Sequence, residues 1–120
     1  MLTTLPLVLA GLMGAAGVVL AALAAHAAPG AGLDGASQML LAHALAILGA
    51  SALIGVGRLR EFGAGLAMLG WIVGGALFAG DVSLRAFTGH RLFPMAAPTG
   101  GTLLIVAWVV FALTAAVRRR

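Results

Sequence analysis

The chain has 120 residues, of which 62% are hydrophobic and 8% are charged, and its net charge is +4. A soluble domain carries roughly a quarter charged residues, so this composition excludes an ordinary water-soluble protein. The chain contains no cysteine, which excludes disulfides and thiolate chemistry, and its arginines stand at the ends of apolar stretches, which favours membrane-surface anchoring over nucleic-acid binding.

Four long stretches lack Asp, Glu, Lys and Arg: residues 1–33, 35–57, 62–80 and 92–117. At ~1.5 Å rise per residue, a helix of about 19 residues covers ~28 Å, close to the ~30 Å hydrocarbon core of a bilayer. The sequence therefore predicts a single all-α domain over residues 1–120, an integral membrane bundle of four transmembrane helices.

The first helix is predicted over about residues 5–28, with Pro6 in its first turn and Pro29-Gly30 after its end. Ala25-His26-Ala27 imitates a signal-peptidase site. However, no basic residue precedes the apolar run, and the run exceeds the usual 7–15 residues of a signal sequence. We expect this segment to be retained as a span.

The second and third helices are predicted over about residues 36–57 and 62–80, joined by a charged turn at residues 58–61. Asp81 and Arg85 stand four residues apart, a spacing that would let the third helix continue for a turn beyond the membrane. The longest connection covers residues 81–98 and includes Arg85, His90 and Arg91, which we assign to an outer loop.

The fourth helix is predicted over about residues 99–117, and its entry turn is Pro98, Thr99, Gly100 and Gly101. Thr99 is the expected N-cap. A short interfacial stretch that dips into lipid before this helix is the alternative.

Arginine placement indicates the orientation. Arg58, Arg60 and residues 118–120 lie on one side of the predicted membrane, and the positive-inside rule places that side, with both termini, in the cytoplasm. Abundant Ala and Gly, with Arg in place of Lys, suggest a bacterial source. We therefore expect a multi-pass protein of the bacterial inner membrane.

Small residues mark faces where helices can pack closely in lipid. Gly70 and Gly74 form a GxxxG pair, and Gly11, Gly14 and Gly17 recur at a spacing of three in the first helix. A homo-oligomer would use such a second smooth face, and a central position of the first helix in the monomer explains it equally well.

Two tryptophans are predicted at mid-membrane depth. Trp71 and Trp108 each lie about nine residues, or ~13 Å, from the inner ends of their helices. Because Trp usually favours membrane interfaces, we expect at least one of these rings at a helix–helix contact, where the indole N–H needs a partner.

Three ionisable residues, His26, His43 and Asp81, lie on small-residue stripes of the first three helices, toward the outer side. Ionisable residues inside a membrane are candidates for function. A structural hydrogen-bonded cluster, proton handling, a metal site and haem ligation are the open alternatives for this candidate polar cluster. For His43 we expect a hydrogen bond to His26 or to a backbone carbonyl.

Several segments resemble one known family: GAAGVVLAALAAH ending at His26, Gln38-Met39 with residues 43–45, LFAG at residues 77–80, and PTGG at residues 98–101 followed by Trp108. Their order is similar to that of the transmembrane protein 256-like family, whose bacterial members are filed as a domain of unknown function. This chain departs from it with Ala42, where members often have an aromatic residue, and Ala79, where they often have Ser. The resemblance implies a small multi-pass membrane protein and no established reaction.

The sequence shows no catalytic or cofactor motif, so we expect neither an enzyme nor a bound cofactor. A non-catalytic accessory or scaffold component is the first function hypothesis, with the lipid bilayer and either copies of itself or a larger membrane complex as partners. The alternative is a conduit for protons, metal ions or small solutes that uses His26, His43 and Asp81.

Overall fold

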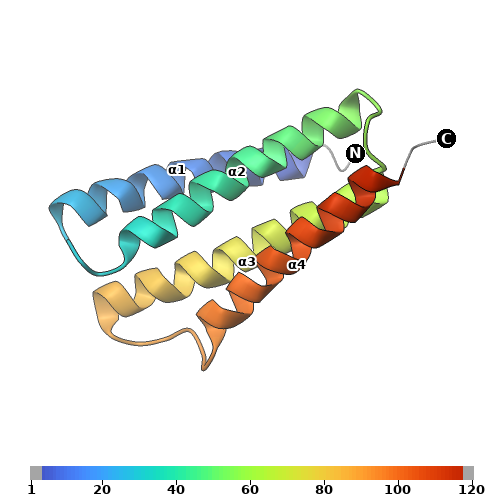
Figure 1. Cartoon of the computed structure of the whole chain (residues 1–120). Coiled ribbons are helices and arrows are strands. Elements are labelled where there is room, and N and C mark those ends of the chain that lie inside the picture. Colours follow the sequence, from blue (N-terminus) through green and yellow to red (C-terminus); the bar gives the residue numbers. More distant parts are fainter. Residues whose placement is uncertain (1–3, 118–120) are drawn as a thin grey trace.

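The computed structural model describes residues 4–117, which form four helices: α1 (Thr4–His26), α2 (Leu33–Gly55), α3 (Glu61–Thr88) and α4 (Ala96–Ala116). The helices make two antiparallel hairpins, α1–α2 and α3–α4, and the start of α1 lies at the same end of the molecule as the end of α4 (Figure 1). The predicted all-α bundle is confirmed. The terminal arginines 118–120 lie outside the described residues.

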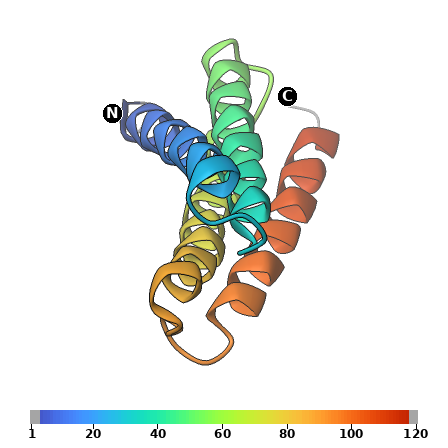
Figure 2. The ribbon, with the colours of Figure 1, turned by 90° about the vertical axis from the view of Figure 1, so that its left-hand side faces the viewer.

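The two hairpins meet through α2 and α3. The most extensive helix–helix interfaces are α3–α4 and α1–α2, followed by α2–α3, whereas α1 barely touches α3. Viewed from one end, α1 and α4 lie on opposite sides of the α2–α3 pair (Figure 2). The first helix is therefore peripheral, which removes a central position in the monomer as the reason for its second smooth face.

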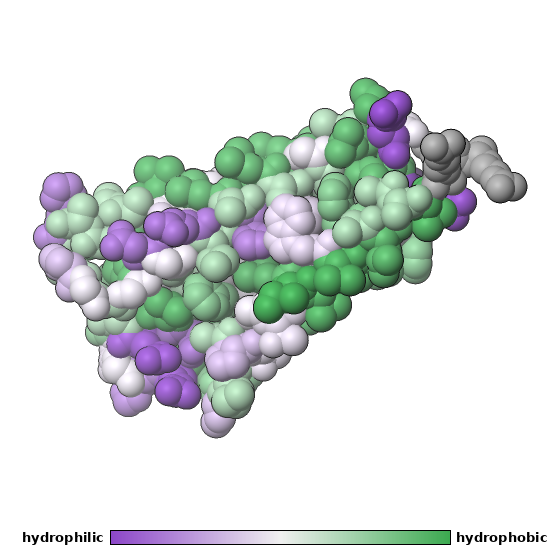
Figure 3. Space-filling model, in the orientation of Figure 1, coloured by the Kyte–Doolittle hydropathy of each residue, from purple (hydrophilic) through white to green (hydrophobic). Residues whose placement is uncertain are grey.

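All four helices are long and apolar enough to cross a membrane. The right-hand half of the visible face is mostly hydrophobic, whereas hydrophilic residues gather at the left end, extend toward the middle and reappear as a smaller group at the right end (Figure 3). Large apolar side chains such as Leu12, Leu45 and Ile105 are more than 60% exposed, as expected for residues that face lipid.

The end of α3 differs from the sequence prediction. The helix continues to Thr88, so the continuation that the spacing of Asp81 and Arg85 allowed is present and runs for about two turns past Gly80, and Arg85 lies in the helix rather than in the outer loop to which it was assigned. It ends at Gly89, which has φ 73° and donates its N–H to the Arg85 carbonyl. Glycine adopts this left-handed conformation without steric cost, so the helix stops at the first residue suited to end it.

The start of α4 also differs. The helix begins at Ala96, three residues before the predicted Thr99, and Met95 takes the N-cap position with φ 68°. Thr99 donates its backbone N–H to the Met95 carbonyl and is therefore inside the first turns, so its assignment as N-cap was wrong. Pro98 fits this start because the first helical turn has no intrahelical acceptors for its N–H groups.

The core lies where α2, α3 and α4 meet. Its buried residues centre on Trp71 and Ile47, both 0% exposed, with Met68, Leu104 and Ala107 around them. Small residues let the backbones of α3 and α4 come close enough to enclose this cluster.

The α3–α4 interface depends on glycine. A Cβ atom at Gly74 would lie 2.8 Å from the Gly100 carbonyl oxygen, and one at Gly100 would lie 2.7 Å from the Gly74 carbonyl oxygen. A Cβ atom at Gly70 would lie 2.7 Å from the Ala107 Cβ. Backbones cannot yield at such distances, so the GxxxG pair packs against α4 as a small-residue motif does in membranes.

Candidate functional site

His43 is buried near the middle of α2, and both of its ring nitrogens are occupied. Nδ1 lies 2.6 Å from the Met39 carbonyl oxygen, and Nε2 accepts a hydrogen bond of 3.1 Å from the Trp108 indole N–H. The indole can only donate, and the carbonyl can only accept. Both bonds together are therefore made by the neutral imidazole that carries its proton on Nδ1.

The bond to Trp108 joins α2 to α4. Within residues 4–117 the backbones of these two helices share no close contact. Trp71 of α3 fills the space between them: its ring centroid lies 6.4 Å from that of His43 and 4.6 Å from that of Trp108. One histidine and two tryptophans thus tie three helices together at one depth.

Phe111 extends this aromatic group along α4. Its ring centroid lies 5.5 Å from that of Trp71 and 6.1 Å from that of Trp108, the latter pair edge to face. Tilted pairs at these distances are favourable beyond the area they bury. The predicted helix–helix contact of Trp71 and Trp108 is present, and we call His43, Trp71, Trp108 and Phe111 the aromatic cluster.

One polar group in the aromatic cluster has no hydrogen-bond partner among the described residues. The Trp71 indole nitrogen is buried, and the side chain is 0% exposed. An unpaired buried N–H costs about 1–3 kcal/mol. The packing of the Trp71 ring against α2 and α4 must therefore outweigh this cost.

The three predicted polar residues are not brought together. His26 is exposed at the last turn of α1, where a basic residue suits the negative end of a helix. In the antiparallel α1–α2 hairpin, His43 lies about ten residues deeper, or ~15 Å. The described residues 4–117 contain no group of three His, Cys, Asp or Glu side chains arranged to hold a metal ion.

Asp81 makes its hydrogen bond outside the candidate polar cluster. It is 1% exposed, and its Oδ1 accepts a hydrogen bond of 3.0 Å from the backbone N–H of Leu92. This bond ties α3 to the connection that leads into α4. A buried carboxylate is costly unless it is hydrogen-bonded, so Asp81 holds this connection against the helix.

Ser37, which the sequence analysis did not single out, makes the corresponding bond between α1 and α2. Its buried hydroxyl donates to the Gly17 carbonyl oxygen at 2.7 Å. A Cβ atom at Gly17 would lie 2.7 Å from Leu41, so the glycine allows this close approach. The sequence feature that could have predicted this bond is a serine among the small residues of α2, which lies next to Gly17 once the α1–α2 hairpin forms.

The remaining predicted site residues are either exposed charged residues near the end of α3 or residues at helix faces. Arg85 is exposed on α3, and His90 and Arg91 are exposed in the connection after it. In the entry to α4, Gly100 packs on Gly74, and the Pro98 carbonyl accepts a hydrogen bond from Thr102. A Cβ atom added at Gly101 would meet no neighbouring atom of the described residues within 4 Å. A Cβ atom at Gly11 or Gly14 would likewise meet no atom of the described residues within 4 Å.

A family model described as "Protein of unknown function (DUF423)" matches residues 13–101. The chain belongs to this family. The match runs from α1 to the entry of α4 and so includes His43, Trp71 and Asp81, and it agrees with the family resemblance that the sequence motifs indicated. No curated protein and no solved structure matches the chain.

Proposed function

We propose that this DUF423 chain is a non-catalytic component of the bacterial inner membrane that acts through its helix surfaces, as an accessory or scaffold subunit. The observation that carries this proposal is how the buried polar side chains are used. Ser37, His43 and Asp81 each bond to another part of the protein and thereby hold two of its elements together.

The bonds of His43 support a structural role over proton transfer. A relay needs a partner that can accept the proton which the ring releases. The Nε2 partner is an indole N–H, which only donates, and the Nδ1 partner is the carbonyl of the preceding turn in the same helix. A metal ion would need a free lone pair, and the lone pair of Nε2 is already used.

The outward surface of α1 supports action through a partner. Gly11 is exposed on this peripheral helix, and α1 packs mainly against α2. Small residues allow close approach of another helix in a bilayer. We expect a photo-reactive amino acid at Gly11 to form a discrete cross-linked band with a polypeptide in native membranes, and lipid adducts alone would contradict an accessory role.

A conduit for protons or ions is the alternative, and flux measurements separate it from an accessory role. Purified protein in liposomes that contain a pH-sensitive dye should pass protons no faster than protein-free liposomes. The His43→Leu variant should behave in the same way. Proton flux that wild-type protein shows and folded His43→Leu lacks would overturn the proposal.

A further inference from the structure

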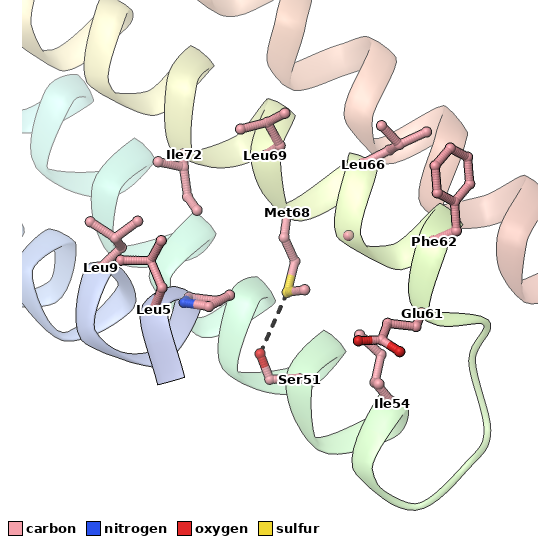
Figure 4. Close-up of a pocket in the computed structure, with 12 residues that line it drawn as sticks. Leu5, Leu9, Ser51, Ile54, Glu61, Phe62, Leu66, Met68, Leu69 and Ile72 are labelled. Atoms are coloured by element: carbon pink, nitrogen blue, oxygen red, sulfur yellow. Dashed lines mark hydrogen bonds between the residues drawn. The ribbon is translucent and has the colours of Figure 1, made fainter. Parts of the chain in front are cut away.

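A deep groove opens on the side of the molecule where α1 diverges from α3. It has a volume of about 720 Å³ and lies between the first turns of α1, the last turns of α2 and the first half of α3. In Figure 4, Leu5 and Leu9 come from α1, Met68, Leu69 and Ile72 from α3, and Ser51 and Ile54 from α2, with the Met68 side chain directed toward Ser51. This volume lies within the range of small-molecule sites.

The groove is apolar along its length and charged at one end. Two of its described lining residues are polar, Ser51 and Glu61, and the Ser51 hydroxyl is directed to the Met68 sulfur at 3.4 Å. Glu61 begins α3, and its side chain points toward Ile54 while Phe62 points away (Figure 4). An occupant must therefore be apolar with a polar group at the Glu61 end.

The length of the groove matches one leaflet. Glu61 and Ile72 mark its two ends on α3, about eleven residues apart, which is ~16 Å. Half of the hydrocarbon core is ~15 Å. An acyl chain that runs along α3 from a headgroup at the membrane surface would fill the groove from end to end.

Charges at the groove entrance indicate the headgroup. Glu61 supplies a carboxylate, and Arg58 and Arg60 are exposed in the turn immediately before it. A headgroup that carries both an ammonium and a phosphate complements the carboxylate and the guanidinium groups together. A headgroup that carries only a phosphate would pair with the guanidinium groups and leave the Glu61 carboxylate without a cationic partner.

We propose that this groove binds an acyl chain of a phosphatidylethanolamine molecule, with the ammonium near Glu61 and the phosphate near Arg58 and Arg60. The proposal rests on the membrane setting of the proposed function. It does not depend on whether the protein conducts protons, because lipid retention and proton flux are measured separately.

Gly65 offers a way to fill the groove without disturbing the backbone. It lines the groove, and a Cβ atom there would meet no atom of the described residues within 4 Å. Gly49 on the exposed side of α2 has equally open surroundings but does not line the groove. Gly65→Phe and Gly49→Phe are therefore a matched pair, and Leu66→Trp provides a second filling variant if Gly65→Phe does not fold.

The test is native mass spectrometry of protein released from nanodiscs that contain equimolar phosphatidylethanolamine and phosphatidylglycerol. Wild-type protein and Gly49→Phe should retain one phosphatidylethanolamine per chain. Gly65→Phe should retain about tenfold less, because displacing two buried methylene groups weakens binding by about that factor. Equal lipid retention by the two glycine variants would show that the groove is not the binding site. A second copy of the chain retained in place of lipid would show that phosphatidylethanolamine is not the occupant.

Glu61→Gln tests the headgroup, with Asp34→Asn as the control for loss of an exposed carboxylate at the other end of the molecule. Wild-type protein and Asp34→Asn should prefer phosphatidylethanolamine about two- to fivefold, the range of a partly exposed ion pair, and Glu61→Gln should lose this preference. Equal retention of both lipids by wild-type protein would overturn the headgroup assignment.

Discussion

His43 shows how a single buried residue joins helices that do not otherwise touch. Its two hydrogen bonds use the ring in one neutral form, and the bond to Trp108 reaches from α2 to α4 across the Trp71 ring. Inside a bilayer an unpaired polar group finds no water to replace a lost partner. The residue is therefore better understood as a structural link than as a reactive group.

We expect His43→Leu to lower the free energy of unfolding by about 1–3 kcal/mol, because it leaves the Trp108 N–H without its acceptor. His43→Gln should recover part of this loss, since its amide oxygen can reach the former position of Nε2. His43→Asn should recover less, because its shorter amide lies nearer to the position of Nδ1. Thermal unfolding in detergent measures all three variants.

A double-mutant cycle with Trp108→Phe isolates the bond itself. The coupling energy between the two positions should be about 0.6 kcal/mol, the average for side-chain hydrogen bonds in a membrane bundle. Strictly additive effects of His43→Leu and Trp108→Phe would show that the bond does not stabilise the fold.

Of the two hydrogen-bond partners of His43, the sequence predicted one and missed the other. A backbone carbonyl was among the expected partners of His43, and the Met39 carbonyl fills that role. Trp108 was missed although its depth allowed it: α2 and α4 both start about three residues before their predicted starts, so the two side chains differ in depth by ~3 Å with either set of ends, and the sequence did not show that α4 comes within reach of α2. With the observed ends, His43 and Trp108 lie ~15 and ~18 Å from the same end of the bundle.

At the scale of elements, glycine decides which helix faces meet. Gly70 and Gly74 lie on the face of α3 that packs closely on α4, whereas a Cβ atom added at Gly11 or Gly14 of α1 would meet no neighbouring atom of the described residues within 4 Å. The sequence marked both sets as smooth faces. The sequence did not predict which helix packs on each of these faces, because the spacing of glycines along one helix does not identify the neighbouring helix.

Gly74→Ala should lower the thermal stability of the protein, because its Cβ would lie 2.8 Å from a backbone oxygen of α4. Overpacking of this kind costs about 1–3 kcal/mol. Gly49→Ala is the matched control at an exposed, open position of α2 and should leave stability unchanged or slightly higher, since Ala favours helix over Gly. Equal losses in both variants would contradict the assigned α3–α4 packing.

The positions of charged residues predicted a helix end correctly only where the helix stops at the edge of its apolar stretch. The charged turn before α3 was placed within one residue, because Glu61 starts the helix. The other end of α3 lies eight residues beyond the predicted span: the spacing of Asp81 and Arg85 indicated one further turn, and the mixed polar and apolar residues 81–88 form about two. The fold class was predictable from the four apolar stretches. The link between α2 and α4 was not, because it depends on side-chain contacts between segments that are far apart in the sequence.

At the scale of the whole molecule, the arrangement of arginines predicts that both termini are cytoplasmic. Single cysteines at Pro29, Val56 and His90 test this, because all three positions are exposed and the chain has no cysteine of its own. An impermeant thiol reagent on intact cells should label Pro29→Cys and His90→Cys and leave Val56→Cys unlabelled, and the opposite pattern would reverse the orientation.

The accessory role is tested most directly by the mass of the untagged protein extracted gently from native membranes. We predict a defined complex heavier than one 11.9 kDa chain, formed either with further copies or with another membrane protein. Native mass spectrometry gives the composition, and Gly11→Leu on the open face of α1 should shift the complex toward the monomer. A wild-type protein that remains a monomer in every mild detergent and in nanodiscs would contradict an accessory or scaffold role.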